Sequence, residues 1–164
     1  MKHSTRISAY LVAGIASVSL LAAPMALAAP GELDDAEATA LAFNREEERL
    51  ARDLYQVFAD QYDGARPFSR IVAAEQQHMD QVGVLLTNYG LPDPSAGSVP
   101  GVYADAELQA AYDKWYAQGM VSIEAAYQVG IELETMDIAE LEASIAATDE
   151  ADIQAVYDRL KAGS

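Results

Sequence analysis

Beyond about residue 33, apolar side chains recur every three or four positions, which is the spacing of a helix that buries one face. Runs of alternating β-branched residues, which are typical of strands, are scarce. The pattern predicts five helices, separated by glycine, proline or short polar segments: residues 34–62, 68–89, 105–118, 122–147 and 149–161. Ser122 and Asp149 are expected to cap the last two helices.

The order and length of these helices predict a fold class. Two long helices come first, a segment rich in Pro, Gly and Ser follows at 91–102, and a short helix precedes the last two. This arrangement is typical of an all-α antiparallel four-helix bundle with a long crossover that carries a short extra helix. No internal repeat is visible, so we expect one domain over residues 34–164 with a last helix that is short, and a tail at 29–33.

The first 28 residues have the pattern of a secretory signal peptide. Lys2, His3 and Arg6 form a basic start, an apolar run follows from residue 7 to 21, and Ala26-Leu27-Ala28 is a small-x-small cleavage pattern. We expect cleavage after Ala28 and a secreted or periplasmic protein without a stable membrane span. The alternative is an uncleaved N-terminal membrane anchor, because the apolar run is almost long enough to span a bilayer.

Charge and composition exclude several classes of function. The formal net charge of −16 becomes −18 once Lys2 and Arg6 are removed, and such a surface repels nucleic acids and anionic membranes but attracts cations. The chain has no cysteine, which excludes disulfides, thiolate metal sites and cysteine nucleophiles. Motifs of serine hydrolases, phosphate loops and zinc-binding H-E-x-x-H helices are also absent from the sequence.

The predicted helix over 68–89 places a histidine and a glutamate on its apolar face. At about 100° per residue, Glu75 lies at the centre of the apolar stripe and His78 about 60° to one side. The stripe is formed by Phe68, Ile71, Val82, Leu85, Leu86 and Tyr89. A carboxylate and an imidazole at positions i and i+3 can bind one ion side by side. A buried carboxylate is costly unless it is paired or binds a metal.

The predicted helix over 122–147 repeats this feature. Glu134 lies at the centre of its stripe, Asp137 about 60° off on the edge, and Glu132 on the opposite, solvated face. The stripe consists of Ile123, Tyr127, Ile131, Ile138, Leu141 and Ile145. On the first helix the angles favour Glu47 as the inward carboxylate and place Glu48 toward the edge.

Several of these stretches resemble known families. Glu48, Ala51 and Tyr55 resemble the first-helix pattern of ferritins and rubrerythrins, and Glu75-Gln-Gln-His78 resembles their Glu-x-x-His ligand pair. The chain is most similar to an uncharacterised ferritin-like family, domain of unknown function 2202. That resemblance spans about residues 40–164 and rests on four stretches: 45–55, 75–80, 86–94 and 129–138. It implies a ferritin-like bundle and a first-helix ligand at Glu48 instead of Glu47.

The resemblance also implies ligands that this chain lacks. Ferritin-like di-iron sites use one Glu from each of two helices and a Glu-x-x-His from each of the other two, whereas this chain has one such pair. The family continues past the equivalent of Ser164 with a segment containing Asn-His-Leu-Arg. Either the sequence is truncated, or Asp137, Glu150, Asp152 or a neighbouring subunit substitutes.

These observations predict a metal site formed by Glu48, Glu75, His78, Glu134 and Asp137, with iron or alternatively manganese in a dinuclear or mononuclear arrangement. The resemblance implies redox chemistry with dioxygen or peroxide, of the ferroxidase or peroxidase kind, and leaves homo-oligomerisation open. Tyr55 is either an ordinary core aromatic or a hydrogen-bond donor to the site. Two alternatives remain for the whole protein: a non-catalytic helical module, and an extracytoplasmic metal buffer that uses its acidic surface.

Overall fold

The computed structural model describes residues 31–164, which form five helices and contain no β-strand. The helices are α1 (Asp35–Gln61), α2 (Phe68–Asn88), α3 (Ala106–Gly119), α4 (Ile123–Ala147) and α5 (Ala151–Gly163). The predicted all-α bundle is therefore confirmed, and each helix begins and ends within two residues of its expected bounds. The expected signal peptide at 1–28 lies outside the described residues. No helix within residues 31–164 is both long and apolar enough to cross a membrane.

Local capping explains where the helices begin. Asp34 and Glu37 form a reciprocal capping box at the start of α1. The Ser122 hydroxyl accepts a hydrogen bond from the Ala125 amide at the start of α4, as expected. The expectation for Asp149 is wrong by one residue: Glu150 occupies the cap position of α5. The Thr148 hydroxyl accepts from the Glu150 amide and so makes the turn that leads into α5.

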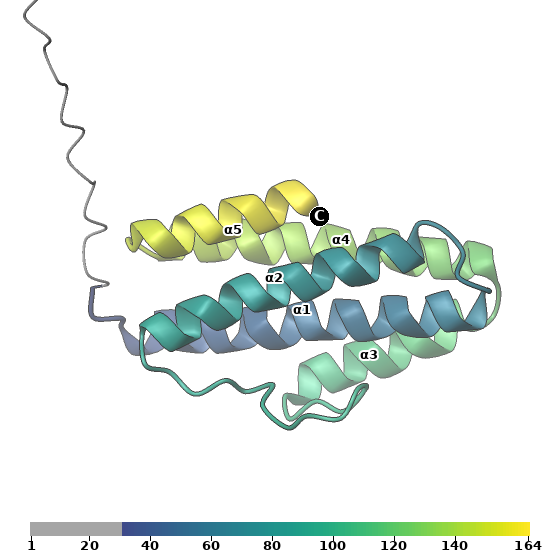
Figure 1. The fold of residues 1–164 in the computed structure, drawn as a ribbon, viewed down its shortest axis with the longest axis horizontal. Helices are drawn as coiled ribbons and strands as arrows, with labels where there is room; N and C mark the ends of the chain where they lie inside the picture. Colours follow the sequence, from purple (N-terminus) through teal and green to yellow (C-terminus); the bar gives the residue numbers. More distant parts are fainter. Residues whose placement is uncertain (1–30) are drawn as a thin grey trace, which may run out of the picture.

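Helices α1, α2, α4 and α5 form the bundle, and the extra helix α3 covers one side of it. Helices α1 and α2 pack together, as do α4 and α5, and α3 lies against α1 and α4 (Figure 1). Helix α5 runs beside one half of α4 and ends near the middle of the bundle, so the other half of α4 has no such neighbour in Figure 1. The expected crossover with its extra helix is thus present, as is the short last helix.

The bundle has two hydrophobic clusters instead of one continuous core. The first lies at one end and includes Leu54, Phe58 and Phe68 together with the first half of α4. The second lies at the other end and includes Leu41, Val82 and Leu141 together with α5. Most of the buried polar and charged side chains lie between the clusters, at the middle of α1, α2 and α4. This polar layer contains the candidate site.

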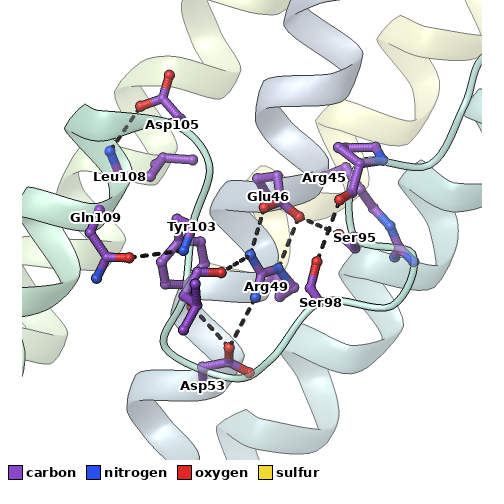
Figure 2. A network of polar contacts seen from close by, with 12 residues as sticks. Arg45, Glu46, Arg49, Asp53, Ser95, Ser98, Tyr103, Asp105, Leu108 and Gln109 are labelled. Atoms are coloured by element: carbon purple, nitrogen blue, oxygen red, sulfur yellow. Dashed lines mark hydrogen bonds and ion pairs between the residues drawn. The ribbon is translucent and has the colours of Figure 1, made fainter.

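A buried ionic network attaches the long crossover to α1 (Figure 2). The Arg49 guanidinium donates to both carboxylate oxygens of Glu46 at 2.9 and 2.6 Å and lies 3.5 Å from Asp53. It also donates to the Val99 and Val102 carbonyls of the crossover. The Tyr103 hydroxyl donates to Asp53. These contacts therefore fix the crossover to the face of α1 that carries Glu46, Arg49 and Asp53.

Candidate metal centre

Three ligand atoms from two helices converge in the polar layer. The His78 Nδ1 atom lies 3.2 Å from a Glu75 oxygen on α2 and 3.3 Å from a Glu48 oxygen on α1. All three residues are buried, and one ligand atom from each lies within 4.8 Å of the others. The i, i+3 spacing on α2 and the packing of α1 against α2 bring these side chains together.

The contacts within this triad do not have hydrogen-bond geometry. Among residues 31–164, neither His78 Nδ1 nor Glu48 Oε1 has a hydrogen-bond partner, although both atoms are buried. Buried polar atoms without partners are rare in proteins because each costs free energy. Atoms that face a common point without donating to one another are what an ion-binding site requires. A buried Glu-Glu-His group of this kind could bind a metal ion.

The electrostatics of the triad also favour a cation. Burial raises the pKa of Glu48 to about 9, against the lowering effect of His78, with further increases from Asp137 and Glu75. Burial alone would lower the pKa of His78, but its two carboxylate neighbours outweigh burial and raise that pKa to about 10. A bound cation would stabilise the ionised carboxylates and displace the imidazole proton.

Glu47 is as buried as Glu48 but has different electrostatic neighbours. Each is 2% exposed. Burial is the largest cause that raises the pKa of Glu47 to about 8. The charges of Asp137 and Glu140, which both lie on α4, also raise this pKa. The electrostatic partners of Glu48 include His78 and Glu75 on α2. The helix angles therefore predicted correctly that Glu47 is buried, but the residue in the triad is Glu48.

The expected orientation of α4 is wrong by about a quarter of a turn. Asp137 is buried at 5% exposure, whereas Glu134 is half-buried and Ile131 is 60% exposed. The buried face consists of Ala126, Val129, Gly130, Leu133, Asp137 and Leu141. Helix α4 is apolar on several sides, so its isoleucines do not mark the inward face.

Glu134 nevertheless belongs to the surroundings of the site. The hydroxyl of Tyr55, a fully buried residue of the first cluster, donates a hydrogen bond to the Glu134 carboxylate. Burial raises the pKa of Glu134 to about 7, against the lowering effect of this hydrogen bond, and Glu75 and Asp137 raise it further. Both expectations for Tyr55 therefore hold: it is a core aromatic and also a hydrogen-bond donor near the site.

An open groove leads from the surface to Glu134. It has a volume of about 400 Å³ and is lined mainly by apolar side chains, among them Phe68, Ile71, Tyr127 and Ile138. Tyr55 and Glu134 also line it, as does Ser164 beyond the end of α5. A small molecule could reach Glu134 through this groove.

Two of the suggested substitute ligands lie elsewhere. The Tyr89 hydroxyl donates to Glu150 at 3.2 Å and to Asp152 at 2.6 Å. Tyr89 lies eleven residues beyond His78 and just past the end of α2, which is about 16 Å along the helix axis. Glu150 and Asp152 therefore do not complete the triad. The C-terminal end of α5 does reach it: a Cβ atom added at Gly163 would lie 2.7 Å from His78 Nε2.

The sequence interpretation did not single out Asn44, which also lies in the polar layer. Asn44 is 2% exposed, and its Oδ1 atom has no hydrogen-bond partner among the described residues. Its Nδ2 group donates to the Ala40 carbonyl, to Ser144 and to Tyr157. The available signal in the sequence was its spacing, because Asn44 lies three positions before Glu47 on the same helix face.

Comparisons with known proteins identify relatives of this bundle. The profile of a family described as "Uncharacterized protein domain (DUF2202)" matches residues 37–164. The uncharacterized protein MJ0754 of Methanocaldococcus jannaschii is 40% identical over 120 residues, which are 73% of this chain and 64% of the relative. The crystal structure of the hypothetical protein MJ0754 aligns with a TM-score of 0.77 at 37% identity, and the match covers 80% of this chain and 74% of that chain. This chain thus spans 64% of the length of that curated relative.

Proposed function

The chain belongs to the family of the uncharacterized protein domain DUF2202, and we propose that it is a metal-binding helical bundle protein whose ion is held by Glu48, Glu75 and His78. One observation carries the proposal. The buried His78 Nδ1 atom lies 3.2 and 3.3 Å from oxygens of Glu75 and Glu48, and it has no hydrogen-bond partner among residues 31–164.

The donor set favours iron or manganese as the ion. One imidazole nitrogen and several carboxylate oxygens suit divalent iron and manganese, and the chain has no cysteine that would favour softer metals. Asp137 is a buried carboxylate of α4 whose charge raises the pKa of Glu48, so it is a candidate for a further ligand. The ion enters a site whose ligands are held in place by two packed helices.

We also propose that the protein is a ferritin-like redox protein. The Glu-x-x-His pair on α2, the Glu48 and Tyr55 positions on α1 and the crossover between the helix pairs support this kinship. When bound, iron or manganese supplies one-electron redox chemistry, such as oxidation of ferrous ion with dioxygen or peroxide as the electron acceptor. One Glu-x-x-His pair lies in the given sequence, whereas the usual di-iron site of ferritin-like proteins uses two.

The chain's own residues would assist this chemistry at the groove. Its largely apolar lining can admit small molecules such as dioxygen or peroxide. The pKa of Glu134 near 7 lets its carboxyl group take up or release a proton at neutral pH. The Tyr55 hydroxyl fixes the orientation of that carboxyl group. Glu134 is therefore the residue we propose as the proton carrier at the mouth of the site.

The signal-peptide pattern at 1–28 and the acidic composition support an extracytoplasmic location. There the protein would handle a metal ion outside the reducing cytoplasm. N-terminal sequencing of the protein secreted by its own host tests this part, because cleavage should leave Ala29 as the first residue.

Elemental analysis of the purified mature protein tests metal binding. The protein is measured as isolated and after anaerobic reconstitution with ferrous ion or Mn²⁺, beside a Glu75→Ala/His78→Ala double variant. We expect near-stoichiometric metal in the parent and its loss in the variant. A folded parent that takes up no metal after reconstitution contradicts the proposal and favours a non-catalytic bundle. Shallow, salt-sensitive uptake that is equal in both proteins favours a metal buffer acting through surface charge.

A further inference from the structure

Helix α5 packs against α2 in an antiparallel register. At the start of α5, Asp152 accepts a hydrogen bond of 2.6 Å from the Tyr89 hydroxyl. Farther along α5, the Arg159 guanidinium donates to the Gln81 side chain of α2 at 3.2 Å. Residue numbers therefore fall on α2 as they rise on α5. Since both helices rise by about 1.5 Å per residue, the next turn of α5 reaches the level of His78.

That turn of α5 places a glycine against the imidazole ring. A Cβ atom added at Gly163 would lie 2.7 Å from His78 Nε2 and 3.1 Å from its Cε1 atom. The shorter distance is about 0.8 Å less than the roughly 3.5 Å at which a carbon atom makes an ordinary contact. The end of α5 is therefore closer to the ring than a residue with a Cβ atom allows without movement.

Burial and hydrogen bonds hold the last turn of α5 in this position. Leu160 and Tyr157 are fully buried members of the second hydrophobic cluster. The Ser164 amide and hydroxyl both donate to the Leu160 carbonyl, at 3.0 and 3.2 Å, and so close the turn around Gly163. Moving this turn away from α2 would disturb the cluster. A side chain at residue 163 would therefore displace the imidazole more readily than the helix.

The other side of the imidazole faces the carboxylates of the triad. His78 Nδ1 lies 3.2 Å from a Glu75 oxygen and 3.3 Å from a Glu48 oxygen, and it has no hydrogen-bond partner among residues 31–164. Two ligand atoms that bind one ion at about 2.1 Å and at a right angle are about 3 Å apart, which is close to these separations. A ring displaced toward the carboxylates would instead form the hydrogen bonds that it lacks and close the space for the ion.

We propose that Gly163 is a positioning residue of the metal centre. Because it has no side chain, the end of α5 lies against the Nε2 edge of His78 and leaves Nδ1 at a distance from Glu48 and Glu75 that fits an ion. This inference rests on the proposed metal binding, since it assigns a role within the same site. Alanine is a better helix former than glycine, so Gly163→Ala should preserve or raise the stability of the metal-free protein and still weaken metal binding.

Titration of the mature chain with Mn²⁺ by isothermal calorimetry tests the proposal in the parent, in Gly163→Ala and in Gly83→Ala. Gly83 is the matched control because it lies on the same helix as His78, and a Cβ atom added there would make an ordinary contact of 3.4 Å with the Arg45 side chain. Urea unfolding measures the stability of each metal-free protein. Proton–nitrogen NMR of the metal-free proteins observes the imidazole directly, because His78 is the only histidine after residue 28.

We expect Gly163→Ala to weaken Mn²⁺ binding at least about tenfold, which is the usual effect of changing an outer contact of a metal-binding histidine. Its urea midpoint without metal should equal or exceed that of the parent, and its imidazole signals should shift. Gly83→Ala should keep the Mn²⁺ affinity and the imidazole signals of the parent.

The proposal is overturned if Gly163→Ala binds Mn²⁺ with the affinity of the parent. It is also overturned if both variants weaken binding equally, since that would indicate a general effect of alanine on the helices. A parent that binds no Mn²⁺ contradicts the proposed function, and the NMR spectra then decide: a shift of the imidazole signals in Gly163→Ala alone upholds the positioning role, and unchanged signals overturn it. Should Gly163→Ala fail to fold, a nuclear Overhauser effect between the Gly163 Hα and His78 Hε1 protons of the parent upholds the contact, and its absence overturns the proposal.

Discussion

Replacing Arg49 with methionine tests whether the buried ionic network holds the crossover on α1. Arg49 is 2% exposed and donates to Glu46 and to the Val99 and Val102 carbonyls. Methionine fills a similar volume but leaves the Glu46 charge without its main partner. Removing one member of a buried ion pair costs about 3–5 kcal/mol. Glu46 keeps only the hydrogen bond from Ser95, so we expect a cost within that range.

Urea unfolding followed by circular dichroism measures this loss, and thermal unfolding should show a decrease in Tm of roughly 10–20 °C for a domain of this size. Arg52→Met is the matched control. Arg52 also pairs with Asp53, but its side chain is 23% exposed, so it should cost about 1 kcal/mol or less. A Glu46→Leu/Arg49→Met double variant removes both charges and should recover part of the stability. Equal losses for Arg49→Met and Arg52→Met, or a loss below about 1 kcal/mol for Arg49→Met, would refute this reasoning.

Three further predictions follow from the site and its packing. Mn²⁺ at about one hundred times its Kd should stabilise the protein by about 2.7 kcal/mol in thermal unfolding, and His78→Ala should lose most of this gain; an equal gain in the variant contradicts the triad. In the folded protein the pKa of Glu47 is about 8, above its ordinary value of 4.5, so unfolding releases its proton between these two pH values. The metal-free protein should therefore lose stability as pH rises from 5 to 8. This group contributes up to about 1.4 kcal/mol per pH unit to that loss. Denaturant unfolding at both pH values checks the sign, and greater stability at pH 8 would contradict this prediction. Gly119→Ala would place a Cβ atom 2.2 Å from the Phe58 ring and should cost about 1–3 kcal/mol, so a variant with the parent's urea midpoint would show that this packing is loose.

Helical periodicity predicted the bundle well because most helices here have one clearly apolar face. Glu75 and His78 were identifiable since their i, i+3 spacing within an apolar stripe is a local property of α2. Helix α4 was harder, because small and branched apolar residues surround much of its circumference. Only its packing against α1 and α5 shows that Asp137 is buried and Ile131 exposed.

The choice between Glu47 and Glu48 could not come from helix angles. Both side chains are buried, and they differ in the helix that each one faces. That difference depends on how α2 and α4 are placed around α1, which is a property of the tertiary structure. The same reason explains why Glu150 and Asp152 were wrong candidates: the start of α5 lies near Tyr89, and its end lies near His78.

Anomalous X-ray scattering from crystals of the Mn²⁺- or Fe²⁺-loaded protein tests the central claim most directly. Data collected at the absorption edge of the metal should show a peak about 2.0–2.3 Å from His78 Nδ1 and from carboxylate oxygens of Glu48 and Glu75. A loaded crystal without a peak at these three residues, or with His78 Nδ1 donating a hydrogen bond to a carboxylate instead, would contradict the account.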